Sequence, residues 1–361
     1  MVSAHTVSLL SPLSAAVTLS PLSLPRDRPM LHVAFMGHAG HGKSTLLAAL
    51  SHRLVQRPEA VSVALRVDGP RLRPVDASAG PGAAPSGGVW AQCVAMASAR
   101  RRYAFHDLPG PRRYLREASR ALGLRDAAVV VVSAAEAARA QTREHVLHAR
   151  GLEARQTLVF VNACDVVDDP AWLDAVEADA REALLDAGVE GDAVRVLRGS
   201  AARSLANDPR WTPTVDALLD ALDGLDDVPH DPDGPLVLPV SESYPGRQRG
   251  LAVVVGRVGR GRVKVGDVVQ SPGVGDYVVR SLEQHGRPVP ECEAGELAGL
   301  GLGYRGATNR APRRGDVVAT PDTVTIRSEL LVTLRLVALP GAGRHTPLRS
   351  GMRGFFHFGT A

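Results

Sequence analysis

Hydrophobic and polar residues alternate along Leu31–Phe35, which is the pattern of a β-strand. After a glycine-rich segment, Leu46, Leu47, Leu50 and Leu54 recur at intervals of three and four residues. That spacing places the four leucines on one face of an amphipathic helix. The pattern therefore predicts a strand, a tight turn and a helix within the first 55 residues.

The hydrophobic pattern predicts alternating strands and helices as far as residue 223. Pro, Gly and Ala are dense between residues 66 and 89, which is typical of a mobile loop. One helix is predicted to begin at Asp169-Pro170 and to end at Gly188. The further strands are predicted at Tyr103–His106, Ala127–Val132, Thr157–Val161 and Ala193–Leu197. Such alternation favours an α/β domain with a mostly parallel sheet, helices on both faces, and ligands at the carboxyl ends of the strands.

From residue 224 onward the pattern changes. An acidic, proline-containing segment at 224–234 reads as a linker, and short strands separated by glycine turns follow it. The predicted strands are Leu236–Leu238, Leu251–Val255, Val263–Val269, Tyr277–Val279, Val317-Val318 and Leu330–Leu336. We therefore expect a small closed β-barrel over 235–321 and an incomplete second barrel over 322–361, after the α/β domain over 31–223.

Composition and charge indicate the cellular compartment and the kind of partner. The chain has 361 residues and a formal net charge of +4. Residues 231–361 hold 17 basic and 12 acidic side chains, which hints only weakly at a polyanionic partner. Three cysteines without metal-ligand spacing favour a reduced, cytoplasmic compartment. The chain contains no run of 18 apolar residues, so no membrane span is predicted. Residues 1–30 lack the cationic start of a secretory signal, and we expect this segment to be disordered.

The segment between the first strand and helix carries the strongest motif. Gly37-x-x-x-x-Gly42-Lys43-Ser44 is the P-loop pattern, in which glycines let backbone N–H groups approach phosphate oxygens. Lys43 neutralises phosphate charge, and the Ser44 hydroxyl reaches Mg²⁺. Of the 42 basic residues only Lys43 and Lys264 are lysines. Because a guanidinium is bulkier than an ammonium, arginine does not fit the compact site that Lys43 would occupy.

Three further segments at predicted strand ends indicate that the nucleotide is a guanine nucleotide. Asp107-Leu108-Pro109-Gly110 would hold Mg²⁺ through its Asp and touch the γ-phosphate through its Gly. Asn162-Ala163-Cys164-Asp165 would accept two hydrogen bonds from the guanine edge, and the backbone of Gly199-Ser200-Ala201 would meet the guanine carbonyl. Each segment alone is a weak signal, but together and in order they are specific.

The candidate site can be stated residue by residue. The metal ligands are Ser44 and Asp107, and the cofactors are GTP or GDP with Mg²⁺. The predicted nucleotide-binding residues are Gly37, His38, Ala39, Gly40, His41, Gly42, Lys43, Ser44, Thr45, Asp107, Pro109, Gly110, Asn162, Asp165, Ser200 and Ala201.

From residue 31 to its end the chain resembles the bacterial elongation factor Tu family of translational GTPases. Besides the four segments above, the resemblance includes Gln141–His145, Val161–Asp169, Gly256–Asp267 and Gly343–Pro347. It implies a GTPase domain followed by two β-barrels, and a monomer that carries aminoacyl-tRNA to the ribosome. It also implies a nucleotide-exchange factor as a partner and no attachment to a membrane.

The chain also departs from the family pattern. The family's water-positioning His directly follows Asp-x-Pro-Gly, and here that place is Pro111. An ungapped count places Gly88 where the family has the Mg²⁺-binding Thr of switch I. The Lys of the guanine motif is Ala163, and an Asp of the P-loop is Gly40.

The barrel region departs in two ways. A Glu of the aminoacyl pocket corresponds to Glu283, but its aromatic neighbour is His285. An ordinary exposed strand carboxylate is an equally good interpretation of Glu283. The chain ends about 40 residues into a third domain that normally runs to more than twice that length, and a barrel does not close with so few strands.

Three functions remain open at this point. The first is a diverged guanine-nucleotide-binding protein that hydrolyses GTP poorly, since most binding residues remain while two hydrolysis residues are gone. The second is an active GTPase that delivers aminoacyl-tRNA. The third is a truncated, non-catalytic binding module. Nucleotide affinity distinguishes the third from the others, and stimulated turnover distinguishes the first two.

Overall fold

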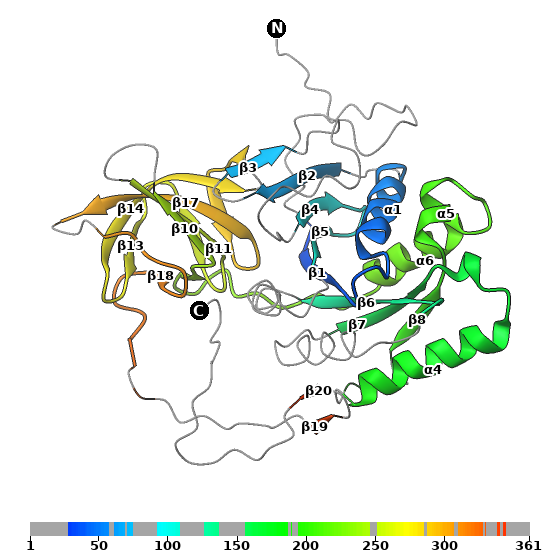
Figure 1. Cartoon of the computed structure of the whole chain (residues 1–361). Helices are drawn as coiled ribbons and strands as arrows, with labels where there is room; N and C mark the ends of the chain where they lie inside the picture. The colour runs from blue at the N-terminus through cyan, green and yellow to red at the C-terminus, as the bar shows by residue number, and fades with distance from the viewer. Residues whose placement is uncertain are drawn as a thin grey trace, which may run out of the picture. The chain divides into compact units, whose positions relative to one another are not determined.

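The computed structural model describes most of the chain in two compact units that divide between Asp227 and Val228 (Figure 1). The described residues are 28–57, 61–68, 71–74, 92–108, 126–136, 156–186, 189, 194–245, 251–284, 287–306, 310–327, 329, 338–339 and 342–343.

The first unit is built on an eight-stranded sheet with the order β3-β2-β4-β5-β1-β6-β7-β8. The strands β5, β1, β6, β7 and β8 pair in parallel, whereas β3, β2 and β4 add an antiparallel extension beside β5. The bounds are β1 Met30–Met36, β2 Val61–Asp68, β3 Arg71–Pro74, β4 Gln92–Ala97, β5 Arg102–Asp107, β6 Ala127–Ser133, β7 Gln156–Asn162 and β8 Arg195–Arg198. The predicted mostly parallel sheet is confirmed.

Helices lie on both faces of this sheet (Figure 1). On one face α4 (Pro170–Asp186) packs Val176, Ala180 and Leu184 against valines of β6 and β7. On the other face lie α1 (Lys43–Val55), α5 (Ala201–Leu205) and α6 (Thr212–Asp223), which contact one another. The Arg53 guanidinium on α1 donates to both carboxylate oxygens of Asp216 on α6, at 3.1 and 2.7 Å. The predicted helices on both faces are therefore confirmed.

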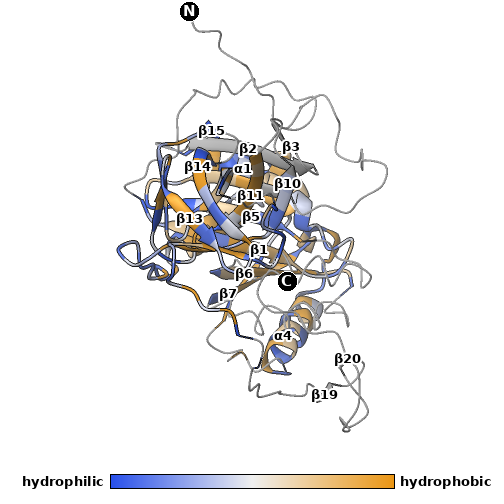
Figure 2. Cartoon of the chain, turned by 90° about the vertical axis from the view of Figure 1, so that its left-hand side faces the viewer, coloured by the Kyte–Doolittle hydropathy of each residue, from blue (hydrophilic) through white to orange (hydrophobic). Residues whose placement is uncertain are grey.

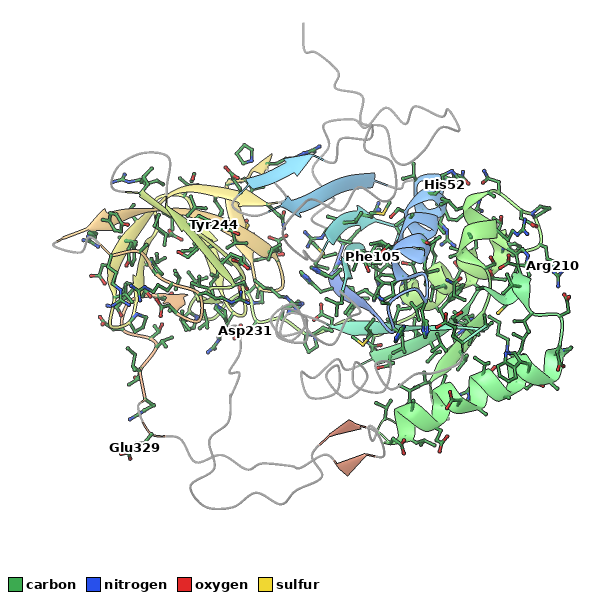
Figure 3. The ribbon with its side chains drawn as sticks, viewed as in Figure 1. His52, Phe105, Arg210, Asp231, Tyr244 and Glu329 are labelled. Atoms are coloured by element: carbon green, nitrogen blue, oxygen red, sulfur yellow. The ribbon has the colours of Figure 1, made fainter. Side chains whose placement is uncertain are left out.

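The central strands are buried along their whole length because helices cover them on both sides. All seven residues of β1 and all seven of β6 are buried, as expected for parallel strands in an α/β core. Figure 2 shows the hydrophobic colour along these strands, while α4 carries hydrophobic and hydrophilic residues side by side. The ring of Phe105 on β5 (Figure 3) meets the ring of Phe35 edge to face, with 5.6 Å between the ring centroids. Full burial of each such ring contributes about 1.5–3 kcal/mol.

The second unit is an antiparallel sheet that curls into a half-barrel, with the order β10-β11-β17-β14-β13-β18-β9. Alternate residues of β11 are buried, so one face of the sheet forms the core, which includes Tyr277, Leu300 and Leu302. The all-β prediction for this region is confirmed. The bounds are β9 Val237–Pro239, β10 Glu242–Pro245, β11 Leu251–Arg257, β12 Arg262–Lys264, β13 Val268–Ser271, β14 Gly275–Gln284, β15 Arg287–Pro288, β16 Glu291–Glu293, β17 Leu297–Arg305 and β18 Val317–Ala319. A separate hairpin of β19 Ala338–Leu339 and β20 Ala342–Gly343 is grouped with the first unit.

Three details of the predicted organisation are wrong. The first part of the predicted 66–89 loop is strand, because β2 runs to Asp68 and β3 follows it. The predicted strand Val263–Val269 is two strands, β12 and β13, since the chain turns at Gly266, whose φ of 99° is left-handed. Residues 28–30 were expected to be disordered, yet Met30 begins β1 and the Pro29 carbonyl accepts from the Arg102 N–H.

Strand β17 was not predicted because every second residue in its middle is glycine. Its buried face consists of Ala298, Leu300 and Leu302, whereas Gly299, Gly301 and Gly303 face β14 side chains. A Cβ added at Gly301 would lie 2.2 Å from the Ser281 hydroxyl oxygen. The glycines are therefore explained by close approach of a neighbouring strand, although glycine normally weakens a strand.

Several predictions fall outside the described residues. These are the expected disorder of residues 1–27, the predicted strand at Leu330–Leu336 and most of the predicted partial third domain. Within the part that the structure describes, no helix is both long enough and apolar enough to cross a membrane.

Candidate functional site

The predicted nucleotide-binding segments follow neighbouring strands of the first sheet. The P-loop follows β1, Asp107 ends β5, Asn162 ends β7, and Ser200 lies two residues after β8. Since these strands run parallel, their carboxyl ends lie at one edge of the sheet. The fold therefore brings four segments, spread between Gly37 and Ser200 in the sequence, to one edge.

Two glycines of the P-loop are required by close contacts. Gly37 has a φ of 134° and Gly42 a φ of 84°, both in the region that disfavours other residues. A Cβ at Gly37 would lie 2.2 Å from the Val131 carbonyl oxygen, and one at Gly42 would lie 2.2 Å from Nδ2 of Asn162. The loop thus lies directly against the ends of β6 and β7.

The Lys43 side chain points back into the loop. Its Nζ donates to the carbonyl oxygens of Gly37 and His38, both at 2.9 Å, and the residue is buried. Burial lowers the pKa of Lys43, and the nearby Asp107 carboxylate opposes that shift. Lys43 also begins α1, whose first N–H groups have no partner within the helix and suit an anion.

The two predicted metal ligands lie together. The Ser44 hydroxyl donates to Oδ2 of Asp107, while Oδ1 of Asp107 is buried and makes no hydrogen bond within the described part of the chain. Burial raises the pKa of Asp107, opposed by the Ser44 hydrogen bond and the Lys43 charge. A hydroxyl next to a buried carboxylate with an unsatisfied oxygen is the donor set that Mg²⁺ prefers, so the residues fit that ion.

Asn162 joins the phosphate and base ends of the site. Its Nδ2 donates to the His41 carbonyl at 2.9 Å, and its Oδ1 accepts from the Ala201 N–H at 2.9 Å. The side chain is buried, so neither backbone group has water as an alternative partner. One amide therefore holds the P-loop, the Asn162–Asp165 segment and the start of α5 in register.

We expect Asn162→Ala to lower the free energy of unfolding by about 2–4 kcal/mol, since each unsatisfied buried group costs about 1–3 kcal/mol. Gln156→Ala is the matched control, because its amide also bridges two backbone groups, the O and N–H of Asp226, but at an exposed position. Urea unfolding would measure both. A loss in Asn162→Ala no larger than in Gln156→Ala would contradict the bridging role.

Asp165 lies at the base end of the proposed site and is paired with a basic side chain. Its Oδ2 accepts from Nε of Arg203 at 3.0 Å. Burial opposes ionisation of Asp165, but hydrogen bonds from Ser200 and Arg203 outweigh it and lower the pKa of this carboxyl. Arg203 is not among the residues predicted from the sequence; the local signal for it is its place three residues after Ser200, which caps the helix.

Not every predicted residue can be placed. Pro109, Gly110 and Pro111 lie outside the described residues, as do Gly88, His285 and Gln141–His145. Glu283 belongs to the second unit, where it is exposed on β14 opposite Gly299 and Pro288.

Comparison with known proteins decides the family. The family described as elongation factor Tu GTP binding domain matches residues 28–226 of this chain. Elongation factor Tu 2 from Streptomyces avermitilis is 36% identical over 339 residues, which cover 93% of this chain and 84% of that protein. The chain belongs to the elongation factor Tu family.

A solved structure agrees with this at the level of the fold. Translation elongation factor SelB from Methanococcus maripaludis, in complex with the GTP analogue GppNHp, matches with a TM-score of 0.61 at 20% identity. The match covers 82% of this chain and 56% of the SelB chain. The chain is thus an elongation-factor-like protein that carries the family's GTP-binding domain.

Two departures from the elongation factor Tu pattern can be located. Ala163, in place of the Lys of the guanine motif, has a φ of 60° and ψ of 33°, so it adopts the left-handed conformation without a side chain that could cover a base. Gly40, in place of the P-loop Asp, has a φ of 88° and no heavy atom within 4 Å of an added Cβ. Neither change disturbs the neighbouring hydrogen bonds of Asn162 and Lys43.

Proposed function

We propose that this elongation factor Tu family member binds GTP and GDP with Mg²⁺ at the P-loop edge of the first sheet and hydrolyses GTP slowly. The observation that carries the proposal is the position of Lys43, whose ammonium is buried inside a loop that Gly37 and Gly42 bring close to the β6 and β7 ends. A buried ammonium bonded only to neutral carbonyls in the described structure is favoured when a phosphate supplies the opposite charge.

The phosphate groups would bind the N–H groups of the loop and of the first turn of α1. Lys43 would bridge two phosphate oxygens, and Ser44 with Asp107 would hold Mg²⁺. When bound, that ion would neutralise part of the negative charge on the β- and γ-phosphates. Pro109 and Gly110 belong to the same proposed set through the motif that begins at Asp107.

The guanine base would lie between the Asn162–Asp165 turn and Ser200-Ala201. The carboxylate of Asp165 would accept from the two N–H donors of the guanine edge, and the Ala201 region would supply backbone N–H to the guanine carbonyl. The side chain of Arg203 would remain beside Asp165 and supply positive charge there, because Ala163 supplies none.

Slow hydrolysis is proposed from the two substituted positions. Pro111 has no side-chain group that orients a water molecule, and Gly88 has no oxygen to coordinate Mg²⁺. Loss of one such contact commonly lowers a rate by about 10²–10³. Nucleotide binding depends on many contacts and GTP hydrolysis on few. Binding therefore survives the substitutions at Pro111 and Gly88 better than hydrolysis does.

We also propose that this chain binds the partners of its family. Aminoacyl-tRNA, the ribosome and a nucleotide-exchange factor follow from family membership, and Glu283 is the proposed contact to the aminoacyl end. The protein would act as a cytoplasmic monomer. The two other functions, full delivery of tRNA and a binding module without nucleotide, are outcomes of the following test.

The test combines two measurements on the nucleotide-free full chain. Calorimetric titration with GDP and GTP is expected to give Mg²⁺-dependent binding, and single-turnover hydrolysis is expected to be slow with and without ribosomes. Binding with fast, ribosome-stimulated turnover would identify an active delivery factor instead. No binding of either nucleotide would refute the proposed function and leave the binding module.

Base choice gives a separate prediction. Asp165→Asn should weaken GDP binding at least about 100-fold, because two hydrogen bonds to a charged group contribute about 1.5–3 kcal/mol each. Xanthosine diphosphate should regain part of the loss, since its carbonyl accepts from the new amide N–H. Competition against labelled GDP measures this, with ATP as the control that should not compete in the parent protein. Equal displacement by ATP and GTP would refute the assignment of Asp165.

A further inference from the structure

The P-loop carries a cluster of metal-ligating side chains that the proposed function does not use, because that function assigns only the backbone of these loop residues to phosphate. His38 and His41 lie in the P-loop, and Glu136 lies in the turn after β6. Each offers one ligand atom, and the three atoms lie within 4.8 Å of one another. The rings of His38 and His41 are 5.1 Å apart between centroids.

The buried member of the cluster is oriented as a metal ligand. Nδ1 of His41 lies 3.3 Å from the carbonyl oxygen of Val131, which accepts only if that nitrogen carries the proton. Nε2 then holds a lone pair, and it is buried without a hydrogen-bond partner in the described chain. Metal-binding histidines characteristically donate the other ring N–H to such a carbonyl, which fixes the tautomer.

The spacing of the cluster also suits an ion. Nε2 of His41 lies 3.7 Å from Oε2 of Glu136, which is too long for a hydrogen bond. Two ligands of a tetrahedral zinc ion, with bonds of about 2.0–2.1 Å, lie roughly 3.3 Å apart. His38 is half-buried and the Glu136 side chain is 42% exposed, so both have room to close around an ion.

We propose that His38, His41 and Glu136 bind a divalent transition-metal ion of the zinc class at the outer turn of the P-loop. Two imidazoles and a carboxylate are a donor set that suits Zn²⁺, with a water molecule in the fourth position. Mg²⁺ prefers oxygen ligands and is assigned to Ser44 and Asp107, so the two ions would not compete for one site. A bound ion would tie the P-loop to the end of β6.

The test is titration of the nucleotide-free, chelator-treated full chain with ZnCl₂ and, separately, with CoCl₂, in excess MgCl₂. We expect one site and a visible Co²⁺ spectrum of a four-coordinate nitrogen and oxygen site. His38→Ala and Glu136→Gln should each raise the Zn²⁺ dissociation constant at least tenfold, and Zn²⁺ should raise the melting temperature of the parent chain but not of these variants.

His52→Ala is the matched control, because His52 (Figure 3) is a histidine of the same unit that lies in the last turn of α1 and is not a member of the cluster. It should bind Zn²⁺ as the parent does. Both tested variants alter side chains that are not fully buried, so they should fold. The proposal is overturned if they bind Zn²⁺ like the parent, if the Co²⁺ spectrum has the intense ultraviolet band of a thiolate ligand, or if no ion binds. Because no nucleotide is present, failure here is distinct from failure of guanine-nucleotide binding.

Discussion

Lys43→Ala is expected to abolish measurable binding of GDP and GTP at micromolar concentrations. The ammonium is buried in the P-loop and donates to the Gly37 and His38 carbonyl oxygens. It therefore lies next to the position proposed for the phosphate oxygens. Charge-assisted hydrogen bonds to a group of opposite charge contribute about 1.5–3 kcal/mol each. Loss of two such bonds therefore lowers affinity by at least about 100-fold. Calorimetry on nucleotide-free protein measures the effect.

The chain supplies a matched control, because it has only one other lysine. Lys264 is exposed on β12 in the second unit and pairs with Glu291 at 3.3 Å, so Lys264→Ala should leave nucleotide affinity unchanged. Lys43→Arg should bind as poorly as Lys43→Ala, since the planar guanidinium is too bulky for the loop. Circular dichroism should confirm that the variants fold. GTP affinity in Lys43→Ala equal to that of the parent would sink the proposed role.

The sequence was most informative where the chemistry is local. Gly37, Gly42, Lys43 and Ser44 are fixed in spacing by the requirements of one short loop, so the motif predicted the strand, the loop and the helix correctly. The association of Asn162 with the P-loop was not visible in the sequence. It arises because β1 and β7 end at the same edge of the sheet, with β6 between them.

The sequence was least informative where a neighbour determines the element. Strand β4 contains Ala95 and Ala97, which have low β-propensity, and forms because it pairs with β5. Strand β17 forms although glycine fills alternate positions. Glycine is needed there because β14, the strand beside it, leaves no room for side chains. Arg203 pairs with Asp165 across a separation of 38 residues, from a helix of five residues that no periodicity would reveal. Pairing, close approach and tertiary contact are not encoded in local patterns.

The positions at which the chain departs from the family pattern are expected to affect nucleotide binding and GTP hydrolysis differently. The hydrogen bonds of Asn162 and Lys43 that organise the binding edge are all present, although Gly40 and Ala163 replace family residues beside them. In the proposed site, binding is distributed over many backbone and side-chain groups, so the substitutions at Gly40 and Ala163 are expected to leave it in place while Lys43 remains. Hydrolysis depends on the placement of one water molecule and on stabilisation of spread negative charge. It is therefore the activity that two substitutions would remove first.

We accordingly expect single-turnover GTP hydrolysis to be very slow in the parent protein, and expect that no single replacement restores it. Pro111 offers no donor or acceptor for the attacking water, and its ring fixes the local φ. Gly88 offers no Mg²⁺ ligand, and its backbone freedom disfavours one ordered arrangement of the segment. Both positions would act on one assembly, so Pro111→His alone should recover little, as is usual for groups that act as a unit.

The experiment compares the parent, Pro111→His, Gly88→Thr and the double variant, each with saturating GTP and with or without ribosomes. Only the double variant is expected to gain rate, by about 10² or more if both contacts are restored. Equal GTP affinity in all four proteins would show that the changes act on hydrolysis and leave binding intact. Fast turnover by the parent would mean that another residue positions the water, and the proposed impairment would then be wrong. A full gain in Pro111→His alone would show instead that Gly88 is not part of the assembly.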